Sequence, residues 1–146
     1  MFYGEYAANS FLSDYIDCYW SMQGFIQEEE TKIISIYPDG CIDIIVNLGD
    51  PIYRPGLAKS LLLSKYVVGA MSNPGSVELT GEVSIFGIRF RPGGAYPFLE
   101  IPLKNLTDKV ADLLFISKRV ARELDSDRLS EALYNLDFSV LDNSLS

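Results

Sequence analysis

Short extended segments separated by Gly and Pro turns fill the first two thirds of the chain, and they are the feature that most constrains its fold. The turns include "PDG" at 38–40, "GDP" at 49–51 and "NPG" at 73–75. This punctuation predicts roughly seven strands before residue 92, in a closed or sandwiched antiparallel sheet. The expected strands are 18–23, 31–38, 41–48, 51–55, 65–71, 76–80 and 82–90. We expect 31–38 and 41–48 to form a hairpin across "PDG".

The hydrophobic period changes after "RPGG" at 91–94 and becomes helical. Three apolar stripes carry this spacing: Leu106, Val110, Leu113 and Leu114; Val120, Ala121 and Leu124; Leu129, Ala132, Leu133 and Leu136. They predict two or three α-helices that cover the sheet or meet another subunit. A further short helix is expected over 9–17, capped by Asn9 or Ser10. The 146 residues fit a single domain, 1–146, with a β part at about 15–92 and a helical part at about 93–146.

Composition excludes several classes of function. Twelve basic against twenty acidic residues give a net charge of -8, which disfavours direct contact with nucleic acid by this segment. The absence of histidine removes catalytic triads and His-based metal sites, so we expect no metal and no cofactor. Two cysteines, no signal peptide and no apolar run of about 20 residues predict a cytoplasmic protein with reduced thiols that does not enter the membrane.

The stretch "PDGCIDIIVNLGDP" at 38–51 places polar residues on one face of an apolar strand. A period of two sets Ile42, Ile44, Val46 and Leu48 on one face and Cys41, Asp43, Ile45 and Asn47 on the other. Asp43 could therefore face a ligand cavity, but a solvated or paired structural carboxylate is the favoured reading.

The same alternation along "EVSIFGIRFRP" at 82–92 sets Arg89 and Arg91 on one face of a strand. Their guanidinium groups could bind an anionic ligand. We favour a structural role over anion binding: Arg89 would neutralise Asp43 or Asp39 across the sheet, because buried charges require partners. The "RPGG" turn lacks the Lys-Ser/Thr pair of a phosphate-binding loop.

The aromatic residues and cysteines near the start of the chain could have either a structural or a functional role. Trp20 is expected to anchor the core, and an aromatic cavity lined by Tyr3, Tyr6, Tyr15, Tyr19 and Trp20 is the less favoured alternative. Cys18 and Cys41 lack metal-binding spacing, and we expect them to be small buried apolar residues.

Taken together, "YW" at 19–20, "PDGCIDIIVNLGDP" at 38–51, "VVGAM" at 67–71 and "VELTGEVSIFGIRFRPGGAYPFLEIPLKNLTDKVADL" at 77–113 resemble the N-terminal sensor domain of a branch of AraC-type transcriptional regulators. The resemblance covers about residues 15–113. It implies a mainly β fold, a cupin-like antiparallel barrel of jelly-roll type, followed by helices. It also implies an effector-binding and dimerising module joined to a C-terminal pair of helix-turn-helix motifs.

The leading hypothesis from this resemblance is a sensor that binds an unidentified small molecule inside the barrel and forms a homodimer through its C-terminal helices. The candidate ligand-binding residues are Trp20, Tyr37, Asp43, Arg89 and Arg91. No helix-turn-helix domain is visible in the chain, so DNA would be reached only through a missing C-terminal domain. The chain is then either a fragment of a longer regulator or a free-standing sensor.

Two other classes of function stay open. A His-free cupin enzyme would use Asp43 with Cys41 or Tyr37 for proton transfer, although the leading hypothesis is that the protein is not an enzyme and has no catalytic residues. A purely structural oligomerisation module would have a barrel filled by side chains.

Overall fold

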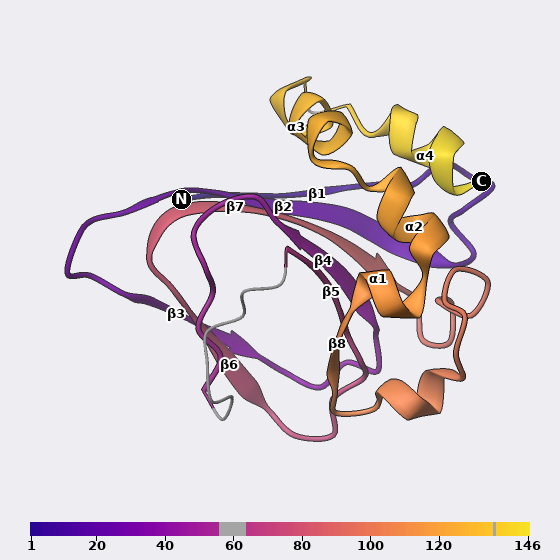
Figure 1. The fold of residues 1–146 in the computed structure, drawn as a ribbon, viewed down its shortest axis with the longest axis horizontal. Helices are drawn as coiled ribbons and strands as arrows, with labels where there is room; N and C mark the ends of the chain where they lie inside the picture. The colour runs from indigo at the N-terminus through magenta and orange to yellow at the C-terminus, as the bar shows by residue number, and fades with distance from the viewer. Residues whose placement is uncertain (56–63, 136) are drawn as a thin grey trace.

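A computed structural model describes residues 1–55, 64–135 and 137–146 and shows two antiparallel sheets with helices at the C-terminal end (Figure 1). The larger sheet has the strand order β1-β2-β7-β4-β5-β8, and the smaller pairs β3 with β6. The strands are β1 Phe2–Tyr6, β2 Ile16–Ile26, β3 Lys32–Ile36, β4 Asp43–Asn47, β5 Lys65–Val68, β6 Gly75–Leu79, β7 Gly81–Phe90 and β8 Val110–Asp112. A mainly β fold with C-terminal helices is thus confirmed.

The two faces of the larger sheet follow the predicted alternation. Residues Ile44 and Val46 of β4 and Phe86 and Ile88 of β7 are fully buried on one face. Asp43, Ile45, Ile85 and Arg89 lie on the other face, toward the smaller sheet. A period of two assigns faces correctly here because each face packs on a different layer of the protein.

The helices cover the first face of the larger sheet (Figure 1). A short 3-10 helix η1 spans Leu103–Leu106, and α1 Leu113–Ile116, α2 Lys118–Glu123, α3 Ser126–Asn135 and α4 Ser139–Leu145 follow. Their apolar residues join the strand residues in one core: Leu113, Val120, Leu129 and Leu141 are fully buried. The predicted stripes therefore cover the sheet, although Val110 to Asp112 form strand β8 rather than helix, and Leu136 lies outside the described residues.

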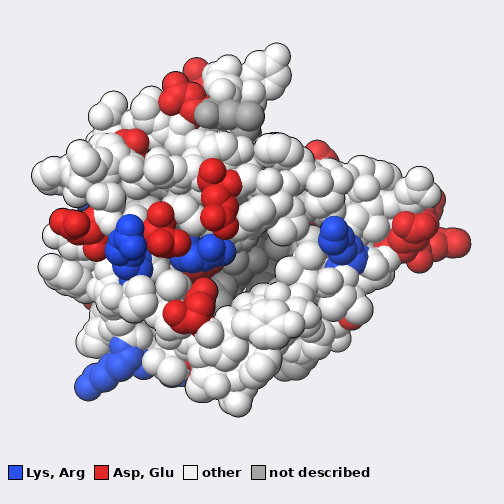
Figure 2. Space-filling view, turned by 180° about the vertical axis from the view of Figure 1, so that it is seen from behind, with Lys and Arg blue, Asp and Glu red and all other residues white. Residues whose placement is uncertain are grey.

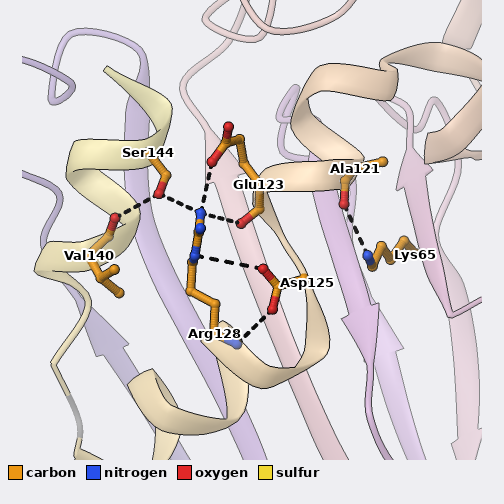
Figure 3. Close-up of polar contacts among 7 residues, drawn as sticks. All are labelled: Lys65, Ala121, Glu123, Asp125, Arg128, Val140 and Ser144. Atoms are coloured by element: carbon orange, nitrogen blue, oxygen red, sulfur yellow. Dashed lines mark hydrogen bonds and ion pairs between the residues drawn. The ribbon is translucent and has the colours of Figure 1, made fainter.

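Side-chain capping and one arginine fix the helical layer. The carboxylate of Asp112 accepts a hydrogen bond from the Leu114 amide, and Ser117 Oγ accepts one from the Val120 amide. Asp112 is therefore the N-cap of α1 and Ser117 the N-cap of α2. Figure 3 shows Arg128 Nη1 donating to Glu123 Oε2 at 2.8 Å and to Ser144 Oγ at 2.8 Å, which ties α2, α3 and α4 together. Multiple hydrogen bonds to one guanidinium fix the orientation of the helices it joins.

The predicted hairpin of 31–38 with 41–48 is wrong. The turn is formed as expected, because Gly40 has a φ of 74° and Asp39 Oδ1 accepts from the Cys41 amide at 2.9 Å. However, β3 pairs with β6, whereas β4 pairs with β5 and β7. The buried face of β4 requires a place in the larger sheet under the helices, so the chain changes sheets at this turn.

The segment 9–17 is also not a helix. Asn9 caps one turn, with its Oδ1 accepting from the Leu12 amide at 3.0 Å, and strand β2 begins at Ile16. The expected strands 76–80 and 82–90 are confirmed as β6 and β7, and the chain turns between them at Gly81, whose φ is 64°.

The described strands form two sheets and no closed barrel. An isolated bridge between Tyr53 and Glu78 joins the short edge segment at 52–53 to β6. Between the sheets lies a second, smaller apolar cluster: Cys18, Trp20, Ile26, Ile52, Leu79, Val83 and Ile85. This cluster borders a cavity between the sheets.

Candidate functional site

A cavity of about 490 Å³ lies between the two sheets. The larger sheet contributes residues of β1, β2, β4, β5 and β7, and the smaller sheet contributes β3 and β6. Figure 2 shows that this side of the molecule is hollowed and that basic and acidic side chains gather beside the hollow. The described lining residues are Tyr3, Trp20, Met22, Ile34, Ser35, Ile36, Tyr37, Asp39, Cys41, Asp43, Ile45, Ile52, Arg54, Tyr66, Val68, Gly69, Met71, Val77, Leu79, Ile85 and Arg89.

Asp43 and Arg89 form the polar centre of the cavity wall. The two residues are direct partners in the β4–β7 ladder, and Arg89 Nε lies 3.8 Å from Asp43 Oδ1. Arg89 Nη1 also lies 3.6 Å from Glu5 Oε2, and Glu5 accepts a hydrogen bond from the Tyr3 hydroxyl at 2.7 Å. The guanidinium on β7 is therefore held between the carboxylate of Asp43 on the adjacent strand β4 and that of Glu5 on β1, two strands away on the other side.

Burial perturbs the ionisation of this group. The pKa of Asp43 is raised to about 6 by burial, against the opposing effect of Arg89. Burial lowers the pKa of Arg89, but the Asp43 carboxylate and the Tyr3 hydroxyl raise it, and the net direction is upward. Burial, then the hydrogen bond to Glu5, raises the pKa of Tyr3 to about 12. At neutral pH the cavity wall therefore carries an ionised but poorly solvated carboxylate.

Two buried hydrogen-bond donors at this wall lack an acceptor. Trp20 Nε1 and Arg89 Nε have no hydrogen-bond partner among the described residues, although Trp20 has only 8 % of its surface exposed. The indole N–H also lowers the pKa of Asp43 without reaching hydrogen-bonding geometry. Buried donors left unpaired are costly, so this part of the wall has hydrogen-bonding capacity that the described residues do not satisfy.

A glycine makes room for the indole. Gly87 is the partner of Trp20 in the β2–β7 ladder, and a Cβ built there would overlap ring atoms of Trp20. The indole therefore lies across the bare backbone of β7 and forms part of the cavity floor.

Of the five residues proposed from the sequence, Trp20, Tyr37, Asp43 and Arg89 line this cavity. Arg91 does not: its Nε donates to the Ser13 carbonyl at 2.6 Å and its Nη1 lies 3.7 Å from Asp17 Oδ1. Arg91 thus fixes the turn before β2, because the β7 ladder ends at Phe90 and the chain turns away.

The aromatic residues divide between the two faces. Tyr3 lies beside Trp20 with ring centroids 6.2 Å apart at the cavity. Tyr6 and Tyr19 instead pack on Phe138 in the helical layer, and Tyr15 packs on Tyr96 and Phe98. Cys18 is buried and Cys41 half-buried, both unpaired with other cysteines.

Sequence reasoning missed Arg54, Tyr66 and Met71 as lining residues. Tyr66 is buried, and its position could have been found from the alternation of "KYVV", which sets Tyr66 and Val68 opposite Val67. No sequence pattern indicates Arg54, because its place depends on how the chain crosses from β4 to the bridge with β6.

The family comparison matches the chain over residues 4–112 to a model described as a domain of unknown function, DUF6597. The chain belongs to the DUF6597 family. Within the described lining, every cavity residue except Tyr3 falls in the matched range, and helix α1 begins directly after the match ends. The DUF6597 match thus covers the two-sheet part that contains the cavity.

Comparisons of this DUF6597 chain with curated proteins and with solved structures found no match. Among its described residues, no group of three or more Cys, Asp or Glu side chains is arranged to hold a metal ion. In the same parts of the chain, none of the helices has the length and apolar character needed to span a membrane.

Proposed function

We propose that this DUF6597 domain is the effector-sensing and dimerisation domain of an AraC-type transcription regulator, and that it binds a small molecule between its two sheets. The observation that carries the proposal is the cavity of about 490 Å³ with two buried, unpaired donors in its wall. Its volume falls in the range of about 300–1,000 Å³ typical of small-molecule sites.

The sequence resemblance and the layer order support the regulator assignment. Antiparallel strands come first, helices come last, and the interior lies on the face away from the helices. We interpret this arrangement as a cupin-like fold in which the smaller sheet faces the larger one across the ligand site. The acidic chain would act in the cytoplasm without a cofactor, and DNA would be contacted only through an attached helix-turn-helix domain.

Proton-transfer catalysis is less well supported. Asp43 is paired with Arg89, which keeps its carboxylate occupied. Burial and the carboxylates of Asp39 and Asp43 raise the pKa of the Cys41 thiol, so the reactive thiolate is disfavoured. Tyr37 is 70 % exposed, which leaves its hydroxyl in solvent. The cavity volume likewise argues against a filled, purely structural module.

A connected path joins the cavity to an exposed apolar surface. Strand β5 supplies Tyr66 and Val68 to the cavity wall and pairs with β8, which leads directly into α1. Helix α1 exposes Leu114 and Phe115, the latter with 81 % of its surface accessible. We propose that this surface contributes to the homodimer, so that a ligand which favours one position of β5 also favours one arrangement of the dimer.

Thermal-shift screening of the chain against a metabolite library tests the binding proposal, because a ligand of the folded state raises stability. Ile34 faces the cavity, so Ile34→Phe should remove the stabilisation by any ligand found. Its neighbour Ile33 is 63 % exposed on the opposite face, and Ile33→Phe is the matched control that should retain it. Ligands unaffected by Ile34→Phe, or a library without any stabilising compound, would contradict the proposal.

A further inference from the structure

Arg54 is a cation in the cavity wall without a carboxylate partner. Its Nη2 contacts Met71 Sδ at 3.8 Å, and no Asp or Glu of the described residues lies within 4.0 Å of its guanidinium nitrogens. The residues outside the described ranges, "GLAKSLLL" at 56–63 and Leu136, contain no acidic side chain. Among the described residues, therefore, no carboxylate forms an ion pair with Arg54, even though the net charge of the chain is -8.

The second cation of the wall is already neutralised. Arg89 lies between Asp43 and Glu5 at 3.8 and 3.6 Å. A ligand carboxylate placed there would approach two existing carboxylates and be repelled. Of the two guanidinium groups that line the cavity, Arg54 is the one whose charge is available to an anion, and half-buried cations are stabilised by such a partner.

The wall near Arg89 requires a neutral acceptor instead. Trp20 Nε1 and Arg89 Nε are buried donors without partners, and the Asp43 carboxylate lies beside them. A hydroxyl or carbonyl oxygen accepts from such donors without adding negative charge, and a hydroxyl can also donate to Asp43.

The strand register sets the separation of the two polar ends. Tyr66, Ile45, Gly87 and Trp20 form one row across β5, β4, β7 and β2. The indole of Trp20 lies over Gly87, so its Nε1 is two strand spacings, roughly 10 Å, from the Tyr66 strand. Arg54 lies toward the Tyr66 end, because its Nη2 contacts Sδ of Met71, three residues after the end of β5, and its charge opposes the effect of burial on the pKa of Tyr66.

The wall between the two ends is mostly apolar. Ile45 lies along the row between Tyr66 and the indole of Trp20, and Met22, Val77 and Ile85 add apolar surface around it. A ligand that spans the row therefore needs an apolar body between two polar ends.

Arg54 lies at one end of the apolar wall and the donors of Trp20 and Arg89 at the other. From this arrangement we infer that the cavity binds a small apolar monocarboxylate, an inference that rests on the proposed function. The carboxylate is bound by Arg54, the apolar body crosses Ile45, and a hydroxyl or carbonyl group at the far end accepts from Trp20 and Arg89. The specificity is then for one negative charge, since a dicarboxylate would place its second charge against Asp43 and Glu5.

The test uses octanoate, hydroxyoctanoate, phenylpropionate and hydroxyphenylpropionate, each beside its methyl ester. Trp20 is the sole tryptophan of the chain and lines the cavity, so its fluorescence reports occupancy. We expect the acids to bind more tightly than their esters. Arg54→Gln should weaken binding of the acids about tenfold, as for the loss of a charge-assisted hydrogen bond, and leave the esters unchanged. Arg54→Lys should keep most of the affinity.

The control variant Lys118→Gln removes one positive charge outside this cavity and should bind the acids as the wild type does. Calorimetry should show that the hydroxylated acids lose their advantage over the parent acids in Trp20→Phe. Equal binding of acids and esters, or unchanged acid binding in Arg54→Gln, would overturn this inference and leave the proposed function standing. Failure of every compound to bind, acids and esters alike, would count against both.

Discussion

Replacing Asp43 by Asn should remove a component of the pH dependence of folding. The carboxylate lies in the cavity wall with 19 % of its side chain exposed, and its pKa rises from 3.8 to about 6 because burial disfavours the charged form. The folded state therefore binds this proton more tightly than the unfolded state does. The resulting stabilisation is fully present below pH 3.8 and is lost as the pH rises through about 6.

The magnitude follows from the size of this shift. At about 1.36 kcal/mol for each pKa unit, the whole effect is on the order of 3 kcal/mol. About 1.3 kcal/mol of it falls between about pH 5 and pH 7, if the unfolded value is the ordinary one. This interval avoids the isoelectric point near 4.4, where a protein carries no net charge and precipitates readily.

Urea denaturation of the wild type and of Asp43→Asn across this interval measures the effect. The free energy of unfolding of the wild type, relative to the variant, should fall by about 1 kcal/mol as the pH rises from about 5 to 7. Glu28→Gln removes an exposed carboxylate outside the cavity and controls for the loss of one negative charge. Parallel curves for wild type and Asp43→Asn would refute the reasoning, as would a relative gain in wild-type stability with rising pH.

Three further changes follow from the geometry. Gly87→Val should destabilise the fold by about 2 kcal/mol or more and shift the fluorescence of Trp20, since the new side chain overlaps the indole. Thermal melts measure the loss of stability, and emission spectra measure the shift. Phe115→Glu should weaken the proposed dimer more than tenfold in sedimentation equilibrium, while Phe11→Glu, also at an exposed site, should not; an unchanged dimer would remove this interface. Arg128→Met should lower the free energy of unfolding by about 1–2 kcal/mol, since its hydrogen bonds join three helices; an unchanged urea midpoint would contradict this.

The faces of the strands could be predicted from the sequence, but their partners could not. Alternation places Asp43 and Arg89 on faces opposite Ile44 and Ile88, and the structure agrees, because side-chain direction is a local property of an extended backbone. Pairing is non-local: β4 and β7 are adjacent in the sheet although far apart in sequence. The local "PDG" signal therefore predicted a hairpin that the burial requirements of β4 override.

The pairing of Asp43 with Arg89 could be predicted from the sequence, whereas the place of Arg54 in the cavity wall could not. Pairing of Asp43 with Arg89 follows from the need to neutralise a buried charge, and the two groups lie 3.8 Å apart. The position of Arg54 depends on the bridge between Tyr53 and Glu78, which no local pattern encodes. Similarly, the short strand β8 has the spacing of a helix, and three residues are too few for periodicity to decide.

Within the described residues, the two sheets face each other through aliphatic side chains, and the backbone hydrogen bonds of each sheet stay inside it or pass through the Tyr53–Glu78 bridge. Contacts between aliphatic side chains have no preferred direction, unlike a ladder of amides and carbonyls. Thr80 alone separates β6 from β7, so the smaller sheet can tilt about this link relative to the larger one without breaking a ladder. The cavity between the sheets can therefore adapt to ligands of different thickness. The distance between Asp43 and Arg89 stays the same, because both belong to the larger sheet.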